Sequence, residues 1–461
     1  MAEFPAVAAD IVRDYMREHD VPGVAVALVR DGRILAEAGF GHADLSRDRP
    51  ATPRTAWPVA SLTKSFTALA AMQLVELGRL SLDAPVTEYL PDLVVRDRET
   101  AARLTVRRLL SHSGGLGRTG HQDRTREDAV NPYPTRESLV AALDSATLQS
   151  EPGQCFSYSN EGYAIVGRIV EVLRGEPLED CFTRHIFERA GMARSAVRFA
   201  EWRAAEDRAI PYAGEGAGPF DSGERHHGYV VGRLNDDYRT FLATGGIVSC
   251  AHDLALYQIA TMDLASRTLG VSAGGLDQMQ SVQFPYGDTG WGYGLGYWVL
   301  WSGATKVIGH SGGLPGVSNY TMMIPSERSG AVVLTNRSDR KAFVLAEMLL
   351  GEIRGRIWRS APTEPLPFET RWPKPSASDL AAFEGEYRFR KGPATVRAGE
   401  GGVVVHTPSR YDGPDQDIHT VQVGPDTFMS RSLGQSIPFV RDASGRVCRF
   451  LHSGYAYERM A

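Results

Sequence analysis

Two polar side chains stand three positions apart at the start of a strongly apolar stretch. Ser61 and Lys64 belong to the sequence Ser-Leu-Thr-Lys, and residues 66–77 are mostly Leu, Ala, Met and Val. A serine hydroxyl becomes an effective nucleophile when a neighbouring base takes its proton, and a lysine removed from water can be that base. Ser-x-x-Lys also arises by chance, so a capping serine followed by a solvated lysine is the alternative interpretation.

The apolar stretch itself is predicted to be a buried helix. Its apolar residues recur at steps of three and four, and Gly78 stands where a C-terminal cap is expected. The stripe consists of Leu62, Phe66, Leu69, Ala70, Leu74 and Leu77. A helix that is apolar on nearly all sides is a buried one. If the helix begins near Ser61, the hydroxyl lies at the positive end of the helix dipole, on the same face as Lys64.

A phenol and an amide occur together further along the chain. Tyr158 and Asn160 flank one residue at the end of a predicted turn that begins at Glu151, and a helical stripe follows from Tyr163. A plain tyrosine and an N-cap asparagine are the alternative interpretation. Beside a serine and a lysine, the two side chains would instead supply a proton shuttle and a hydrogen-bonding amide.

Three histidines outside these motifs carry weaker signals. His112, in the sequence Ser-His-Ser-Gly-Gly, is expected to satisfy backbone groups of its own loop rather than to take part in catalysis. His226 and His227 lie in a polar, glycine-rich region from Arg198 to Tyr238 that is predicted to be an insertion or lid. The pair indicates no particular function. Residues 117–134 are predicted to form a surface loop near the site entrance.

Length and composition indicate a globular protein of two domains. The chain has 461 residues, of which 43% are hydrophobic and 23% are charged, and its net charge is -5. A negative chain is a poor candidate for electrostatic nucleic-acid binding. The N-terminus has neither the basic nor the apolar region of an export signal, and no stretch is long enough to span a bilayer. We therefore expect a cytoplasmic protein.

The cysteines indicate neither a disulfide framework nor a metal site. Cys155, Cys181, Cys250 and Cys448 are scattered without CxxC spacing, so reduced thiols are expected. Cys250 and His252 are too isolated to argue for a metal. We expect no cofactor and no bound metal.

Strand patterns surround the predicted helix. Residues 23–29 and 34–40 flank an Asp-Gly turn and are predicted to form a hairpin. Residues 291–298 are predicted to be a strand rich in glycine and aromatic residues, and His310-Ser-Gly-Gly313 follows. Strands at 320–324 and 331–335 precede a helix at 343–357, and strands from both ends of this region can share one sheet.

The C-terminal part of the chain changes character. Five prolines between Ala361 and Pro375 predict a semi-rigid linker, and short strands separated by turn signals follow. About 85 residues of such strands favour a small antiparallel barrel. The predicted division is therefore a catalytic domain at residues 1–358, a linker at 359–375 and a β domain at 376–461.

Three motifs stand in order: Ser61-Leu-Thr-Lys64, Tyr158-Ser-Asn160 and His310-Ser-Gly312. This set resembles the serine β-lactamase, DD-peptidase and penicillin-binding-protein superfamily, with its Ser-x-x-Lys, Tyr-x-Asn and Lys/His-Ser/Thr-Gly motifs. Other segments, such as residues 109–115 and 245–249, also match, so the resemblance covers roughly residues 10–355. It implies an α+β fold, an α/β sandwich, to which the chain adds a C-terminal antiparallel barrel like that of lipocalins.

The resemblance also implies a role for each motif residue. Ser61 would be the acylated nucleophile. Lys64 and Tyr158 would share the general-base and general-acid duty, and Asn160 would hold Lys64 and the substrate amide.

The third motif implies a histidine in the place of a lysine and one donor of an oxyanion hole. His310 stands where many β-lactamases have lysine, and an imidazole suits a proton relay to Tyr158 better than a grip on an antibiotic carboxylate. Efficient β-lactamase activity is therefore less expected. The oxyanion hole would be formed by the backbone N–H groups of Ser61 and Gly313, each worth roughly 3 kcal/mol of barrier.

Tyrosine in the second motif with histidine in the third is similar to class C-type relatives: D-aminopeptidases, D-amino acid amidases, family VIII esterases and penicillin-binding-protein-type thioesterases. The last are stand-alone cyclases of nonribosomal peptides with a C-terminal lipocalin-like domain, and this architecture matches the chain. The expectation is a cyclase acting on a peptidyl thioester with a D-residue at the acyl position. A D-aminopeptidase, an amidase or a carboxylesterase is the alternative; a β-lactamase and a non-catalytic peptide-binding protein are less expected.

The expected partner is a small peptide or a peptidyl thioester, which a carrier protein could present. Neither a nucleic acid nor a membrane is expected as a partner, and the sequence does not fix the oligomeric state.

Overall fold

The structure is a computed structural model of the whole chain. It describes residues 3–93, 95, 98–117, 148–197, 199–213, 221–232, 242–287, 289–302, 304–338, 341–355, 372–389, 392–407, 416–430, 436–452 and 455–460. Most of the predicted surface loop at 117–134 and of the predicted linker at 359–375 lies outside these ranges, so both predictions, and the domain limits that depend on them, stay predictions.

A nine-stranded antiparallel sheet forms the centre of the larger part of the described chain. Its strand order is β3-β2-β1-β14-β13-β12-β11-β10-β9. The strands are β1 (Gly23–Arg30), β2 (Arg33–Asp44), β3 (Arg49–Pro50), β9 (Phe284–Pro285), β10 (Gly292–Tyr293), β11 (Trp298–Ser302), β12 (Thr305–Leu314), β13 (Val317–Ile324) and β14 (Ser329–Thr335). Strand β1 pairs with β14 from the far end of this region, which confirms that strands from both ends share one sheet.

The two faces of the sheet pack against different helices. Val24, Val26 and Leu28 of β1 face α1 (Ala6–Glu18) and α13 (Ala342–Ile353). The alternate residues of β1, beginning at Ala25, face the larger helical layer on the other side. Because successive side chains of a strand point to opposite faces, a strand buried on both sides is apolar throughout, as β1 is from Val24 to Val29.

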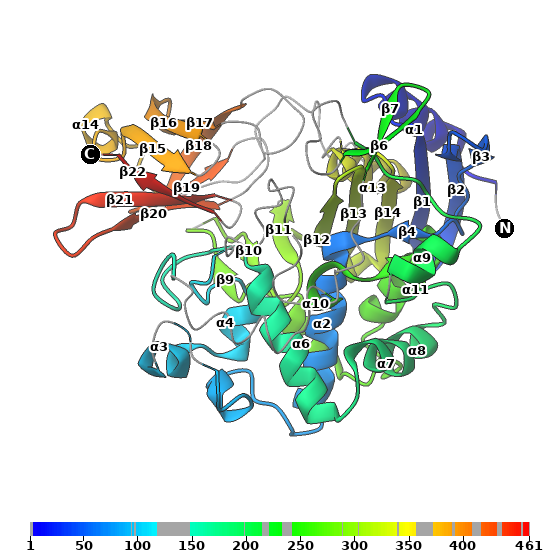
Figure 1. Ribbon diagram of the computed structural model, residues 1–461, viewed down its shortest axis with the longest axis horizontal. Coiled ribbons are helices and arrows are strands. Elements are labelled where there is room, and N and C mark those ends of the chain that lie inside the picture. Colours follow the sequence, from blue (N-terminus) through cyan, green and yellow to red (C-terminus); the bar gives the residue numbers. More distant parts are fainter. Residues whose placement is uncertain are drawn as a thin grey trace.

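The larger helical layer carries the first two motifs (Figure 1). Its helical elements are η1 (Ala60–Leu62), α2 (Thr63–Glu76), η2 (Val86–Glu88), α3 (Arg98–Arg103), α4 (Val106–Leu110), α6 (Asn160–Arg174), α7 (Leu178–Phe182), η5 (Thr183–Phe187), α8 (Glu188–Ala190), α9 (Phe199–Ala204), α10 (Leu242–Gly245), α11 (Ala251–Met262) and α12 (Ala273–Met279). The short 3-10 helix η8 (Pro325–Glu327) joins β13 to β14. Two small sheets, β4 (Trp57–Pro58) with β8 (Val248–Ser249) and β5 (Tyr212–Ala213) with β7 (Tyr229–Gly232) and β6 (Asp221–His226), complete this part.

Helix α2 is buried on all sides up to Leu74, as its composition predicts, but Leu77, the last residue of the predicted stripe, follows the helix and is exposed. Every residue from Thr63 to Leu74 is buried, and Phe66 stacks on Tyr257 of α11 with ring centroids 3.9 Å apart. Gly78 has a φ of 65° just after the helix, and the next N–H bonds back to Leu74. This is the left-handed C-terminal cap expected from the sequence.

Two local predictions are corrected. Residues 291–298 do not form one strand: β10 ends at Tyr293, and a turn containing Gly296 separates it from β11. A side chain at Gly296 would lie 2.8 Å from the Cα of Ser65, so the chain turns here to pack against α2. Asn160 is not the N-cap of α6; Ser159 is, and its hydroxyl accepts from the N–H of Gly162.

The C-terminal region forms a closed barrel, as predicted. Its strands are β15 (Gly385–Phe389), β16 (Gly392–Gly399), β17 (Gly402–Thr407), β18 (Gln416–Gly424), β19 (Thr427–Ser430), β20 (Ser436–Arg441), β21 (Val447–His452) and β22 (Tyr455–Arg459), preceded by α14 (Ala377–Leu380). Phe383, Phe428, Phe439 and Phe450 meet inside it with ring centroids 5.0–5.5 Å apart. The interior is therefore a packed aromatic core.

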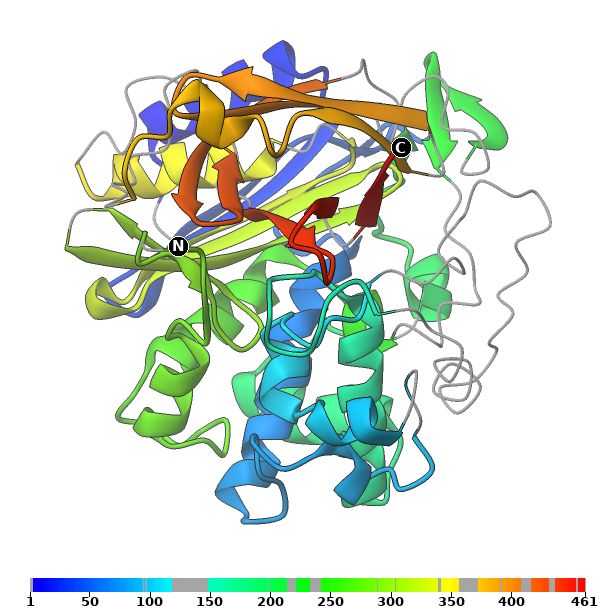
Figure 2. The ribbon, with the colours of Figure 1, turned by 90° about the vertical axis from the view of Figure 1, so that its left-hand side faces the viewer.

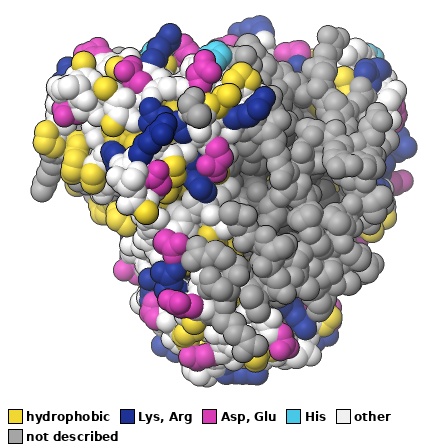
Figure 3. Space-filling view, turned by 60° about the vertical axis from the view of Figure 1, so that its left-hand side comes forward, with side chains coloured by type: hydrophobic (Ala, Val, Ile, Leu, Met, Phe, Trp, Pro, Cys, Tyr) yellow, Lys and Arg dark blue, Asp and Glu magenta, His cyan; other side chains and the backbone are white. Residues whose placement is uncertain are grey.

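The barrel lies beside the β9–β11 edge of the large sheet, with the chain termini on opposite sides of the molecule (Figures 1 and 2). Its contact with this edge is close, because a side chain at Gly287, after β9, would lie 1.9 Å from the carbonyl oxygen of Val423. Figure 3 shows Lys and Arg interspersed with Asp and Glu over the described part of one barrel face. None of the helices in the described ranges has the length and apolar composition needed to cross a membrane.

Candidate active site

Ser61 is held at the entrance to α2 by a strained backbone. It lies in η1 and is partly exposed, whereas its neighbours Ala60 and Leu62 are buried. Ala60 has a φ of 53°, a left-handed conformation that costs a residue with a Cβ free energy. The preceding segment is fixed by hydrogen bonds from Asn319 to the carbonyl of Pro58 and from Val59 to Ile247. The surrounding structure thus presents the Ser61 hydroxyl in a defined direction.

Lys64 contacts the Ser61 hydroxyl from inside the protein. Its Nζ lies 3.0 Å from Ser61 Oγ and donates to the carbonyl oxygen of Thr244 at 2.9 Å, and the whole side chain is buried. Thr244 is held in turn, because the adjacent Ala243 carbonyl accepts from the hydroxyl of Thr67 on α2. The prediction that Ser61 and Lys64 share one helix face is confirmed, and their contact has the geometry of a nucleophile and a base.

The second motif reaches the same point from another segment. Tyr158 is partly exposed, and the Nζ of Lys64 lies 4.9 Å from the centroid of its ring. Asn160 is also partly exposed and is the first residue of α6. The structure therefore brings Tyr158 beside the Ser61–Lys64 pair. The hydrogen bonds predicted for Asn160 stay predictions.

His310 lies on β12 and is held away from the predicted relay. Its Nδ1–H donates to the carbonyl of Ser311 at 2.6 Å, and its Nε2 accepts from the hydroxyl of Tyr293 at 2.8 Å. Burial, together with the nearby charge of Lys64, lowers the pKa of His310 to about 3. The imidazole is therefore neutral. Since both ring nitrogens are engaged, the predicted direct relay to Tyr158 is not the arrangement seen.

The two glycines after Ser311 lie on opposite sides of β12. A side chain at Gly312 would lie 2.2 Å from the carbonyl oxygen of Val59, so the strand packs directly against the segment that carries Ser61. Gly313 is exposed, and a side chain there would meet open space. This close approach places the backbone of Gly313 near the nucleophile's segment and leaves its N–H as the candidate oxyanion donor.

Sequence reasoning missed three contributors to this site. The carbonyl of Thr244 bears no side-chain signature, and Tyr293 is one of several aromatic residues in its segment. Trp298 stacks parallel to the Tyr158 ring, at 6.3 Å and 8°. The repeated glycines beside these residues were the available signal, since they permit close backbone packing.

The barrel packs against the segment that carries Tyr158. Val421, Val423 and Met429, from β18 and β19, join an apolar cluster that includes Tyr158 and Trp298. On the other side of the second motif, Cys155 packs in a cluster with Val440, Cys448, Leu451 and Ala456 of the barrel. The segment that carries Tyr158 is thus packed against the outer face of the barrel.

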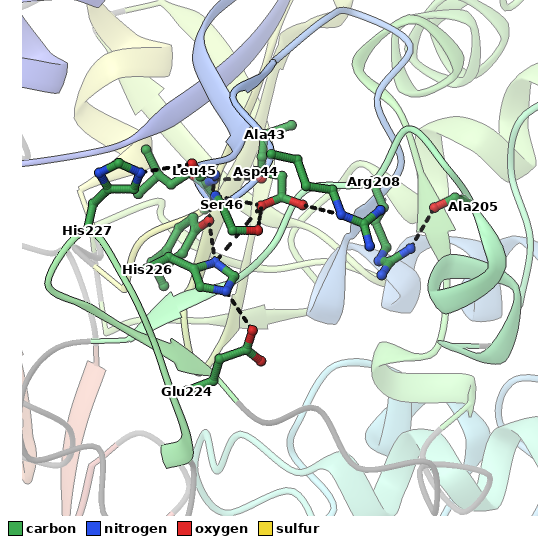
Figure 4. Close-up of polar contacts among 12 residues, drawn as sticks. Ala43, Asp44, Leu45, Ser46, Ala205, Arg208, Glu224, His226 and His227 are labelled. Atoms are coloured by element: carbon green, nitrogen blue, oxygen red, sulfur yellow. Dashed lines mark hydrogen bonds and ion pairs between the residues drawn. The ribbon is translucent and has the colours of Figure 1, made fainter.

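The paired histidines lie in a separate network (Figure 4). His226 Nε2 bonds to Glu224 at 2.7 Å, and its Nδ1 lies 3.3 Å from the Tyr212 hydroxyl and 3.9 Å from Asp44. The next residue, His227, bonds to the carbonyl of Leu45. These contacts fasten the β6–β7 hairpin to the end of β2. Within the described ranges, no group of three or more His, Cys, Asp and Glu residues is arranged to bind a metal.

Fold and site together have the form of the serine β-lactamase and penicillin-binding-protein hydrolases. The chain belongs to the beta-lactamase family, whose model matches residues 8–353. It is 30% identical over 393 residues to penicillin-binding protein 4 of Amycolatopsis lactamdurans, an alignment covering 81% of this chain and 95% of that protein.

Two solved structures match the whole architecture. An octameric penicillin-binding protein homologue from Pyrococcus abyssi has 26% identity and a TM-score of 0.65, covering 98% of this chain and 99% of that one. The structure of SurE has 24% identity and a TM-score of 0.70, and the match covers 98% of both chains. A second structure of SurE contains D-Leu. At this identity, SurE shows the fold alone.

Proposed function

We propose that this protein is a thioesterase of the penicillin-binding-protein type, which releases a peptide from a thioester and closes it into a ring. The observation that carries the proposal is the contact between Lys64 Nζ and Ser61 Oγ at 3.0 Å, with the lysine buried and the serine partly exposed. A buried base touching an accessible hydroxyl is what acyl transfer through a covalent intermediate requires.

In the acylation step, Ser61 Oγ attacks the thioester carbonyl carbon, and its proton passes to Lys64, which must hold an unprotonated amine at this step. The backbone N–H groups of Ser61 and Gly313 would stabilise the resulting oxyanion. The carbon–sulfur bond then breaks, and the leaving thiolate takes a proton relayed from Lys64 through Tyr158. The product of this step is an ester between the peptide and Ser61.

In the second step, the amine at the other end of the peptide attacks the ester carbonyl. The attacking nitrogen gives up one proton to the Lys64–Tyr158 pair, and the pair delivers that proton to Ser61 Oγ as the carbon–oxygen bond breaks, which yields a lactam and the free serine. Water competes with the amine for the same ester. The barrel would favour ring closure over hydrolysis, since Val421, Val423 and Met429 belong to the apolar cluster that includes Tyr158 and help to exclude water there.

The proposed substrate carries a D-residue at the acyl position. The likeness to SurE, which was solved with D-Leu, supports this preference, as does the combination of Tyr-x-Asn with His-x-Gly. A carrier protein would present the thioester, and the enzyme would work in the cytoplasm.

The test is mass spectrometry of the products formed from a linear peptidyl thioester that ends in a D-residue, with S61A as the control. The proposal expects a product lighter by one water than the linear acid, formed by the wild-type protein and not by S61A. Linear acid alone would contradict cyclisation and make a hydrolase the better description. D-amino acid amides and short nitrophenyl esters would then separate a D-aminopeptidase or amidase from a carboxylesterase.

A further inference from the structure

We infer that His112 is a positioning residue, which holds Tyr158 in the orientation that proton transfer needs. The inference rests on the proposed function, because it assigns Tyr158 a part in proton transfer. Its basis is that hydrogen bonds from the residues on both sides of Tyr158 end on His112. The N–H of Ser157 donates to the His112 carbonyl at 2.7 Å, and the N–H of Ser159 donates to its Nδ1 at 3.0 Å.

The ring of His112 also supports the phenol directly. The imidazole is 1% exposed, and its centroid lies 4.1 Å from that of the Tyr158 ring. Tyr163 and Tyr293 close the other sides at 5.0 and 4.7 Å. The phenol therefore rests on a ring that is itself fixed by packing and by a hydrogen bond.

The backbone at His112 is strained, which indicates that its side chain has a role there. Helix α4 ends at Leu110, and the N–H of Ser113 bonds back to the carbonyl of Arg108 at 2.8 Å, as in a Schellman cap. In that cap the left-handed position usually belongs to glycine, yet His112 occupies it with a φ of 56°. A glycine would relieve the strain but would remove both the acceptor and the ring. The strain is thus retained where the side chain serves Tyr158.

The hydrogen bond from Ser159 also fixes the form of the ring. An imidazole that accepts at Nδ1 is neutral and carries its proton on Nε2. The titratable groups facing it are the phenols of Tyr158, Tyr163 and Tyr293, and the Lys64 amine lies beyond the Tyr158 ring. If the ring were protonated at Nδ1, two N–H groups would face each other, and the hydrogen bond from the N–H of Ser159 would be lost.

The segment that carries Tyr158 has no regular structure to hold it otherwise. Residues 155–159 are neither helix nor strand, and α6 begins only at Asn160. By contrast, Lys64 lies within a buried helix. The position of the Tyr158 ring, 4.9 Å from Lys64 Nζ, must therefore come from tertiary contacts, and His112 supplies two hydrogen bonds and one ring face.

The test compares two variants of nearly equal shape. H112N keeps a carbonyl oxygen close to the position of Nδ1 and tolerates the left-handed backbone, whereas H112L removes the acceptor. The probe is a fluorophosphonate, for which the maximal rate of Ser61 labelling and the concentration giving half of it are measured separately. We expect H112L to lower the maximal rate about 10- to 100-fold with little change in half-saturation. H112N should recover most of that rate.

A double-mutant cycle separates positioning from general destabilisation. In the Y158F background, H112L should slow labelling less than threefold, because the group that it positions is already missing. The control is T105A, which removes the N-cap of α4 and lowers the melting temperature without altering the contacts of His112. T105A should label at the wild-type rate. If H112L does not fold, H112G, which suits the left-handed backbone but removes both the acceptor and the ring, completes the same cycle in the wild-type and Y158F backgrounds.

The outcomes distinguish the positioning role of His112 from the proton-transfer role of Tyr158 on which it rests. A Y158F variant that labels like the wild type would overturn the proton-transfer role of Tyr158, and the inference with it. Two other results would overturn the inference alone. In the first, Y158F labels slowly, but H112L slows labelling by the same factor in the wild-type and Y158F backgrounds. In the second, H112L labels at the wild-type rate.

Discussion

The two sides of the candidate site are held in different ways. Ser61 and Lys64 stand at the start of a helix whose residues are buried from Thr63 to Leu74. Tyr158 stands on an irregular segment that is placed by His112 and by apolar contacts with the barrel. The nucleophile and its base are therefore fixed by one helix and its core, whereas the phenol depends on three segments far apart in the sequence.

The largest expected effect comes from the buried side of this comparison. K64M replaces the amine with an apolar chain of similar length inside an apolar core, so the fold should be kept. Labelling of Ser61 by a fluorophosphonate should fall at least about 1000-fold, because the hydroxyl loses its base. K306M, which alters a lysine paired with Asp277 on the surface, is the control and should label normally. A reactive K64M would show that another group activates Ser61.

The next effect concerns the strand that packs against the nucleophile. In G312A the new methyl group would meet the carbonyl of Val59, so β12 must move away from the segment carrying Ser61. We expect labelling to fall by about 100-fold, which is the size of effect seen when an oxyanion donor is displaced. G313A, one residue later, meets open space and should stay within about threefold of the wild type. Equal effects of the two substitutions would contradict the proposed packing.

The barrel contact can be weakened with a matched pair in one loop. Both Gly287 and Gly290 have left-handed backbones, with φ of 57° and 74°. A methyl group at Gly287 would collide with the carbonyl of Val423, whereas one at Gly290 has no heavy atom closer than 4.0 Å. G287A should therefore slow labelling about 5- to 20-fold and raise the share of hydrolysed product, while G290A costs strain alone. Identical product ratios would show that the barrel does not affect the site.

The last expected effect concerns the stability of the protein rather than its labelling, and it comes from His310. The pKa of His310 is lowered from 6.5 to about 3. Between these two pH values the imidazole is therefore protonated in the unfolded chain and neutral in the folded protein. Stability is then complete above pH 6.5 and is lost as the pH falls toward 3. Between pH 7 and 5, the wild type should lose roughly 2 kcal/mol more unfolding free energy than H310Q, measured by urea denaturation. Parallel losses in both proteins would contradict the buried neutral imidazole.

The parts of the molecule that follow from local pattern could be predicted from the sequence. The apolar stripe of α2, the Asp-Gly hairpin and the strands of the barrel have periods and turn residues that specify them locally, and the structure confirms all three. The spacing of three also placed Lys64 next to Ser61, because residues three apart share a helix face.

Contacts between distant segments could not be predicted in the same way. The carbonyl of Thr244, which accepts from Lys64, is a backbone group without a sequence signature. The hydroxyl of Tyr293, rather than a residue of the three motifs, donates to His310, since tertiary packing decides which of several aromatic residues meets this imidazole. The cluster joining Tyr158 to Val423 likewise depends on how the barrel lies against the sheet edge.

The most direct test of the account is to identify the residue that a fluorophosphonate modifies in the intact protein. Mass spectrometry should show one adduct per chain, and peptide mapping should place it on Ser61, with no adduct in S61A and a strongly reduced rate in K64M. An adduct on another serine, or none in the wild type, would contradict the assignment of Ser61 and Lys64 as nucleophile and base.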